Sequence, residues 1–384
     1  MKFSGNINSK FPKMGTTIFS VMSALAKEHN AINLSQGFPE FQPHPLVIAA
    51  FEKAIKSGNH QYAPMPGLLS LREVIAEKVN DLYSLAVNPE SEITITAGAT
   101  QAIFTAITSL LKEKDEVIVF APAYDSYTPA IELVGATPVY YSMVAPDFSI
   151  DWGKVAKLVS HKTKMIIINS PHNPSAKVFS QDDILQLEKI VKGTDIIILS
   201  DEVYEHIVFD EKKHLSVLKN KALADRSIAV FSFGKTYHTT GWKIGYVIAP
   251  ENITAEYRKV HQYNVFSVST SSQIAYADIL KHQDLYLELS SFYQAKRDYF
   301  QAALKSTRFK LLPCEGTYFQ LVSYNGISDL NDKEFAKWLT REKGVASIPI
   351  SVFYPNHDEG KVIRFCFAKE NETLKRAAEW LSKI

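Results

Sequence analysis

The chain has 384 residues, 46% of them apolar, which is enough for one large domain or two smaller ones with a substantial core. Its 42 basic and 41 acidic residues leave a net charge of +1, so charge gives no reason to expect nucleic acid or an anionic membrane as a partner. The two cysteines, Cys314 and Cys366, cannot form a disulfide framework, and no clustered Cys or His spacing indicates a metal site.

The first residues, Met1–Asn8, lack the apolar core of a signal peptide. No later run reaches the roughly 18 apolar residues that a membrane-spanning helix needs. We therefore expect a cytoplasmic protein that does not bind a membrane.

Short runs that are apolar at nearly every position recur along the chain, with helical stretches between them. The runs are Ile93–Thr96, Val117–Phe120, Met165–Ile168, Ile196–Leu199, Ile228–Phe231 and Tyr246–Ala249. Such runs are typical of strands buried on both faces, as in a mostly parallel sheet covered by helices. Between them, Ala102–Leu111 and Ile184–Val191 have the spacing of the crossover helices that parallel strands require. The sequence therefore predicts an α/β core over about residues 47–290.

The part of the chain after the helical-looking Leu285–Leu304 has strands and helices of its own. These include Thr317–Ser323, Lys333–Leu339 and Thr373–Ile384. No internal repeat or long Pro/Gly/Ser linker marks the junction. We expect a separate, smaller domain, with a boundary near residue 290.

Five polar residues come just after five of the apolar runs. They are Thr100, Tyr124, Asn173, Asp201 and Lys235. In an open α/β sheet, ligands bind outside the carboxyl ends of the strands. We therefore expect these side chains to converge on one crevice.

Lys235 lies in the Ser/Gly/Thr-rich stretch Ser232–Lys243, directly after an apolar run. An amine in a partly desolvated pocket near another cation loses its proton more easily and can form a Schiff base with a carbonyl. Lys243 could be that cation or could hold a phosphate. A solvated loop lysine is the alternative, and this stretch alone leaves both interpretations open.

Two motifs upstream, Asn169–Pro174 and Ser200–Tyr204, complete an ordered set with Ser232–Lys243. Together the three motifs resemble the fold-type I aminotransferases, which use pyridoxal 5′-phosphate (PLP). The resemblance begins at Gln36–Pro39 and continues to Arg364–Phe367. The segments Gln61–Gly67, Pro171–Pro174 and Lys235–His238 are most similar to the methionine and kynurenine aminotransferase branch.

The resemblance implies a fold with two domains. The large PLP-binding domain would comprise residues 47–290 and contain a mostly parallel, seven-stranded sheet between helices. Residues 1–46 and 291–384 would form an N-terminal arm and a smaller α/β domain. A homodimer with shared active sites is implied as well.

The resemblance also implies which residues hold the PLP phosphate. They are Gly98, Ala99, Thr100, Ser232 and Lys243, with Tyr62 reaching across from a second subunit. Independently, Gly98–Gln101 begins an apolar helix, whose free N–H groups and dipole favour an anion. Thr100 is also expected to cap this helix.

Four residues match those that surround the cofactor ring in the resembled family. Asp201 would pair with the pyridine nitrogen and keep it protonated, which makes the ring an electron sink. Asn173 and Tyr204 would hydrogen-bond the phenolic oxygen, and Tyr124 would stack on the ring. Glu202 is the adjacent alternative to Asp201, but consecutive strand side chains point to opposite faces.

Lys235 would serve twice, as the partner of PLP in an internal aldimine and then as the amine that moves a proton between the substrate Cα and the cofactor. Arg364 would bind the substrate α-carboxylate, helped by Asn173 and the Gly37 backbone. Phe19 is a candidate for the apolar substrate pocket. Lys235, Asp201 and Tyr204 are thus the expected catalytic residues.

The favoured function is a two-stage transamination of methionine, an aromatic amino acid or kynurenine with a 2-oxo acid, through the aldehyde and the pyridoxamine 5′-phosphate forms of the cofactor. No second arginine is evident for a distal carboxylate, which argues against an aspartate-specific enzyme. A PLP-dependent carbon–sulfur β-lyase is the near alternative, and a non-catalytic PLP-binding regulator is the distant one. We expect His172, His206 and His238, inside or beside the motifs, to have structural roles. The sequence leaves the physiological amino donor and acceptor open.

Overall fold

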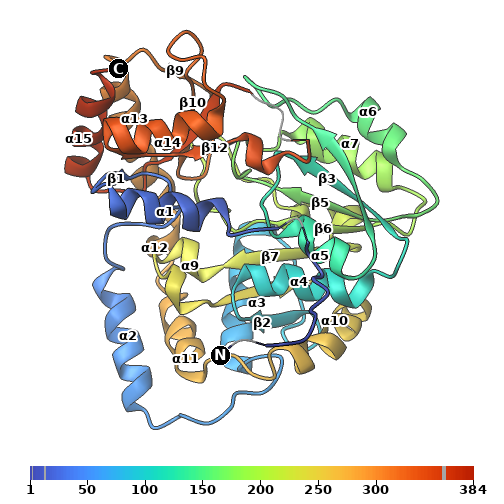
Figure 1. Ribbon diagram of the computed structural model, residues 1–384. Coiled ribbons are helices and arrows are strands. Elements are labelled where there is room, and N and C mark those ends of the chain that lie inside the picture. The colour runs from blue at the N-terminus through green and yellow to red at the C-terminus, as the bar shows by residue number, and fades with distance from the viewer. Residues whose placement is uncertain (2, 13, 357–359) are drawn as a thin grey trace.

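The computed structural model describes residues 1, 3–12, 14–356 and 360–384. A seven-stranded sheet lies at its centre (Figure 1). In spatial order the strands are β2 (Ile93–Thr96), β8 (Gly245–Ile248), β7 (Ser227–Ser232), β6 (Ile197–Asp201), β5 (Thr163–Asn169), β3 (Glu116–Ala121) and β4 (Thr137–Ser142). β8 is antiparallel to both of its neighbours, and the other neighbouring pairs are parallel. The prediction of a mostly parallel sheet is confirmed.

Successive side chains of the central strands pack into two different cores. In β5, Ile166 and Ile168 join the core on one face of the sheet, and Met165 and Ile167 join the core on the other. The helices on the first face include α3 (Leu69–Tyr83), α6 (Trp152–Leu158) and α7 (Gln181–Val191), and those on the second are α4 (Ala99–Leu110), α5 (Tyr127–Leu133) and α10 (Glu251–Asn264). Burial on both faces explains why these strands read as unbroken apolar runs.

β4 is the strand that no apolar run indicated. It lies at the edge of the sheet, and its residues, from Thr137 to Ser142, are partly or fully exposed. An edge strand that faces solvent needs no continuous apolar sequence, so its Thr-Pro-Val-Tyr-Tyr-Ser stretch carried no comparable signal.

A second core joins the start of the chain to its end. A four-stranded antiparallel sheet has the order β12 (Ile348–Pro349), β13 (Val362–Cys366), β10 (Phe319–Ser323) and β9 (Lys310–Leu311). β1 (Ile32–Asn33) pairs in parallel with β11 (Val345–Ala346). These strands pack with α13 (Leu289–Leu304), α14 (Asp332–Lys343) and α15 (Asn371–Leu381), at the upper left of Figure 1. α1 (Ile18–Glu28) crosses beside α14.

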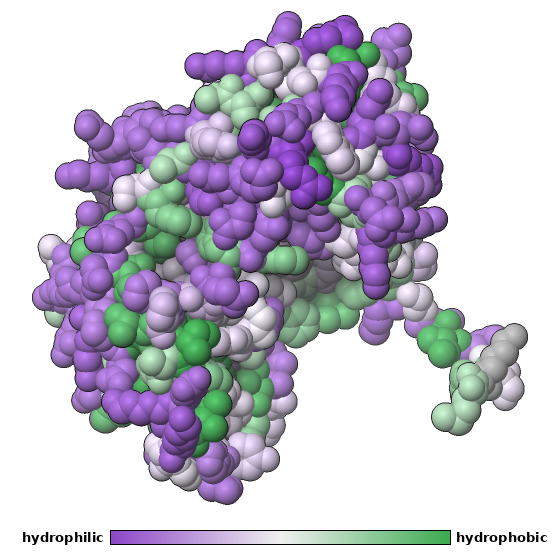
Figure 2. Space-filling view, turned by 90° about the vertical axis from the view of Figure 1, so that its left-hand side faces the viewer, coloured by the Kyte–Doolittle hydropathy of each residue, from purple (hydrophilic) through white to green (hydrophobic). Residues whose placement is uncertain are grey.

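The remaining helices connect these layers. They are α2 (Pro45–Lys56), α8 (Lys221–Ala224), α9 (Phe233–Thr236), α11 (Thr270–Ile279), α12 (Asp284–Leu287) and the 3₁₀ turns η1 (Val217–Lys219), η2 (Thr240–Trp242) and η3 (Ser351–Phe353). Within the described residues, no helix combines the length and apolarity needed to cross a bilayer. Residues 3–10 are exposed, and Figure 2 shows the N-terminal segment extending away from the body.

Candidate active site

A cavity of about 340 Å³ lies beside the carboxyl ends of β2, β3, β5, β6 and β7. The structure brings thirteen of the sequence-predicted site residues to its wall. They are Phe19, Gly37, Gly98, Ala99, Thr100, Tyr124, Asn173, Asp201, Tyr204, Ser232, Lys235, Lys243 and Arg364. The five polar residues that follow five apolar runs therefore share one crevice, because parallel strands end at the same edge of the sheet.

Lys235 lies in the short helix α9, directly after β7. Its Nζ donates to the Tyr318 hydroxyl at 2.8 Å and to the Gly37 carbonyl at 3.2 Å. The amine also lies 5.5 Å from the centre of the Tyr204 ring. Burial lowers the pKa of Lys235 to about 8, so a substantial fraction of the amine is neutral near that pH.

Asp201 is the last residue of β6, opposite Asn169 at the end of β5. Its carboxylate accepts a hydrogen bond of 2.6 Å from the Tyr127 hydroxyl and a longer one from the Val203 N–H. Burial raises the pKa of Asp201 to about 6. Glu202 instead bonds His214 and Ser200, which confirms that the neighbouring carboxylates point apart.

The N-terminus of α4 faces the cavity beside Lys243. Gly98 has a φ of +79°, which glycine adopts without strain, and a Cβ placed there would lie 3.5 Å from Lys243 Nζ. Ser232 and Thr100 also line the cavity. The expectation that Thr100 caps α4 is wrong. Gly98 is the N-cap residue, and Thr100 already lies inside the first turn of the helix. No side chain makes a capping hydrogen bond at this end.

Arg364 projects from β13 and is only 1% exposed. Its Nη1 donates to the Asn173 amide oxygen at 2.7 Å and its Nη2 to the Ser35 carbonyl at 3.3 Å, while Nε is buried without a partner. The guanidinium lies 3.9 Å from the centre of the Phe319 ring. Burial lowers the pKa of Arg364, so an anionic partner would stabilise the cation.

Two tyrosines of the predicted set have different surroundings. The Tyr124 hydroxyl lies 3.5 Å from Thr100 Oγ1 at the edge of the cavity. Tyr204 is buried, with its ring perpendicular to that of Tyr318 at 5.2 Å, and burial raises its pKa. Burial raises the pKa of both hydroxyls, so each is neutral near pH 7 and can donate a hydrogen bond.

Several candidates lie away from the cavity. Tyr62 is 79% exposed and packs edge-on against Phe266, so within one subunit it does not reach the site. His172 bonds Ser175, His206 lies beside Glu205, and His238 packs on Phe41. These histidine positions fit structural roles.

Several residues that line or contact the site were not singled out from the sequence, and three of them hold predicted site residues. Tyr127 donates to Asp201, the Asn169 amide donates to the Asp201 carbonyl and accepts from the Asn173 N–H, and Tyr318 contacts Lys235. Asn169 opens one of the quoted motifs, so position in the motif could have indicated it. Nothing in the sequence distinguishes Tyr127 and Tyr318 among 18 tyrosines.

Comparison with known proteins gives the class to which this arrangement belongs. A family model for aminotransferases of class I and II matches residues 29–381, so the chain belongs to that family. It is therefore a PLP-dependent aminotransferase.

Individual relatives cover nearly the whole chain. The methionine aminotransferase of Escherichia coli is 51% identical over 98% of both chains, and human kynurenine–oxoglutarate transaminase 1 is 31% identical over 94% of this chain and 93% of its own. Among solved structures, that of YbdL from Escherichia coli, identified as having a methionine aminotransferase function, matches with a TM-score of 0.97 at 50% identity, over 99% of this chain and all of its own.

Proposed function

We propose that this enzyme transfers the amino group of L-methionine to a 2-oxo acid. The observation that carries the proposal is the lining of the cavity. Among the described residues there, Arg364 is the only arginine, and apolar side chains including Phe19, Ile103 and Phe319 also line the cavity. One arginine serves an α-carboxylate, whereas a second carboxylate on the substrate would lack a matching cation. The similarity to a methionine aminotransferase supports the same choice.

The residues present fit PLP, and we assign them as follows. The N–H groups at the start of α4, together with Ser232 and Lys243, would hold the phosphate. Asp201 would pair with the protonated pyridine nitrogen, since a buried carboxylate with a raised pKa gains from a cationic partner. Asn173 and Tyr204 would contact the phenolic oxygen, and Tyr124 would stack on the ring.

When bound, PLP supplies an electron sink that stabilises negative charge at the substrate Cα. The chain supplies the remaining functions. Arg364 and Asn173 orient the substrate through its carboxylate, which fixes the direction of the Cα–H bond. The Lys235 amine, with its lowered pKa, would accept the proton from the substrate Cα and then deliver it to the cofactor side of the exchange.

We also propose a homodimer in which Tyr62 contributes to the partner's cavity. The exposed pair of Tyr62 and Phe266 supports this, because large apolar side chains on a surface favour an interface. For the domain division we keep 47–290 against 1–46 with 291–384, which the pairing of β1 with β11 supports. A cytoplasmic location is supported by two buried, unpaired thiols, Cys314 and Cys366.

The test is a single half-reaction. Purified enzyme loaded with PLP is mixed with L-methionine without any oxo acid, and the absorbance spectrum and the released products are measured. We expect conversion to the pyridoxamine spectrum with one equivalent of the oxo acid derived from methionine. L-aspartate, as the control substrate, should react at least about tenfold more slowly, because the described cavity wall has no second arginine for its side-chain carboxylate. A tenfold difference corresponds to about 1.4 kcal/mol of transition-state binding.

Three outcomes would contradict the proposal. Equal rates with aspartate and methionine would remove the substrate preference. Continuous release of ammonia with a thiol would assign a lyase reaction. Ordinary turnover by Lys235→Ala would remove the lysine from the mechanism, since we expect that variant to lose at least about 10³-fold in rate.

A further inference from the structure

The Lys235 amine is the corner of a hydrogen-bonded triangle. The amine donates to the Tyr318 hydroxyl and to the Gly37 carbonyl. The Tyr318 hydroxyl in turn donates to the same Gly37 carbonyl at 2.7 Å. A hydroxyl has a single hydrogen, and here Gly37 receives it. The Tyr318 oxygen therefore acts only as an acceptor toward Lys235.

The count of donors in this triangle matches a neutral amine. A neutral lysine amine has two N–H donors and one lone pair, and the triangle accepts both hydrogens. The lone pair is left free. An ammonium would have a third N–H without a partner in the triangle, and burial lowers the pKa of Lys235 in the same direction.

The parts of the triangle are held rigidly. The Tyr318 ring is fully buried, with ring centres at 5.2 Å from Tyr204 and 5.6 Å from Tyr293. Its backbone carbonyl accepts from the Phe367 N–H, beyond the end of β13. Gly37 approaches closely because it has no side chain: a Cβ there would lie 2.8 Å from the Phe319 ring.

We propose that Tyr318 is a positioning residue which, with the Gly37 carbonyl, holds the released amine of Lys235 by both hydrogens and so keeps its lone pair available for the Cα proton. The inference rests on the proposed role of Lys235. In the transfer, the amine lone pair forms a bond to the proton, and the electron pair of the broken C–H bond stays with the substrate. A tyrosine here thereby orients the base without exchanging protons itself.

Other groups also influence this amine. They are Cys366 and Arg364 from β13, Asp201 from β6, Lys243 before β8, and the aromatic rings of Tyr204 and Tyr318. Replacement of Tyr318 by phenylalanine leaves all of these in place and removes only the hydroxyl that Lys235 contacts. The Tyr318 oxygen is a hydrogen-bond acceptor, which favours the ammonium form, so its removal is expected to lower the pKa of Lys235 further.

The test compares Tyr318→Phe with Tyr293→Phe. Tyr293 is equally buried in the same cluster, but its hydroxyl has no hydrogen-bond partner, so its removal controls for loss of a buried oxygen. In the full chain freed of PLP, the rate of Lys235 carbamylation by cyanate is followed against pH by peptide mass spectrometry. We expect the midpoint to fall by about one pH unit in Tyr318→Phe and to stay unchanged in Tyr293→Phe.

A second measurement uses the enzyme loaded with PLP. In Tyr318→Phe the rate constant of the methionine half-reaction should fall about tenfold, with KM within about twofold of the parent, because orientation of the base and not substrate binding is lost. An unchanged midpoint and rate would overturn the proposal, as would equal changes in Tyr293→Phe. The carbamylation result does not depend on methionine being the substrate, so failure of the proposed substrate remains distinguishable.

Discussion

Two buried arginines, both in the C-terminal part of the chain, have opposite surroundings. Arg297, in α13, donates twice to Asp210, at 2.6 and 2.7 Å, and also to Asp298 and to the Cys314 carbonyl. Arg364 has an amide oxygen and a carbonyl as partners, and one N–H with none. A buried cation hydrogen-bonded to two carboxylates joins parts of the fold, whereas one with no carboxylate as a hydrogen-bond partner fits our proposal that Arg364 binds the substrate carboxylate.

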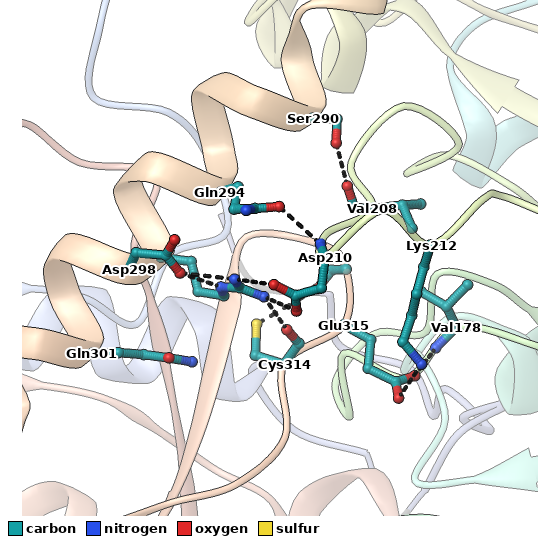
Figure 3. A network of polar contacts seen from close by, with 12 residues as sticks. Val178, Val208, Asp210, Lys212, Ser290, Gln294, Asp298, Gln301, Cys314 and Glu315 are labelled. Atoms are coloured by element: carbon teal, nitrogen blue, oxygen red, sulfur yellow. Dashed lines mark hydrogen bonds and ion pairs between the residues drawn. The ribbon is translucent and has the colours of Figure 1, made fainter.

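Figure 3 shows the polar contacts around the Asp210 carboxylate, which we call the saturated cluster. The Asp210 backbone N–H donates to the Gln294 side-chain oxygen, and the Ser290 hydroxyl donates to the Val208 carbonyl. Glu315 accepts from Lys212 and from a backbone N–H. The network thus connects α13 to the loop after β6 and to the segment before β10, away from the cavity.

Two aspartates repeat the contrast. Hydrogen bonds from Arg297 lower the pKa of Asp210, which is partly exposed, while burial raises the pKa of Asp201 to about 6. The anionic form of Asp210 therefore stabilises the folded state, whereas the anionic form of Asp201 lowers the free energy of unfolding. This difference supports our proposal that Asp201 pairs with a cationic group of the bound cofactor.

Among the tests of this comparison, the largest effect is expected from Arg364→Lys. Lysine keeps the charge but lacks the planar fork for a carboxylate and the stacking on Phe319, so kcat/KM for methionine should fall by at least about 100-fold. Steady-state kinetics and thermal unfolding would be measured together. A melting temperature near that of the parent, with this kinetic loss, would support the contrast; kinetics within about tenfold of the parent would break it.

Arg297→Met should give the opposite pattern. The variant loses four hydrogen bonds and the contact with Phe209, but its aspartate partners are about half exposed and can be rehydrated. We expect a loss of about 1–3 kcal/mol in the free energy of unfolding by urea, with KM for methionine within about twofold. A raised KM at unchanged stability would show that this cluster, too, serves the substrate.

The sequence predicted one side of this contrast better than the other. Apolar runs indicated six of the seven strands, and polar residues at their ends indicated the cavity, because both follow from local patterns. Arg364 could be noticed because an arginine stands among the apolar residues of a strand. Arg297 could not, since it lies in an ordinary amphipathic helix and Asp210 is 87 residues away in the chain.

The same limit applies to the contacts around the site. Tyr127 reaches Asp201 across 74 residues and Tyr318 reaches Lys235 across 83, and both contacts depend on how strands and domains pack. The motifs therefore predicted which groups meet, but not which tyrosines hold them. Thr100 shows a different error. Threonine is a favoured N-cap residue, but the sequence did not show that α4 begins one residue earlier, at Ala99.

The last expected effect, the dependence of stability on pH that Asp201 causes, leaves the kinetics aside. Its pKa is about 6 in the folded chain and about 3.9 when unfolded, so between these values the folded state binds more protons. Stability without cofactor therefore falls as pH rises from about 4 to 6. Asp201→Asn removes this loss, so we expect it to stabilise the PLP-free protein by about 2–3 kcal/mol at pH 7.5 and by less than about 1 kcal/mol at pH 4.5.

Asp210→Asn is the matched control, with the sign reversed. Because the pKa of Asp210 is lowered, its contribution is present above the unfolded pKa and is lost as pH falls, so its removal destabilises the protein near neutrality and less in acid. Urea unfolding of both PLP-free variants at the two pH values measures the difference. Destabilisation by Asp201→Asn at both pH values would contradict this prediction. It would mean that the hydrogen bond from Tyr127 outweighs the cost of desolvation, so that the Asp201 carboxylate stabilises the fold as Asp210 does.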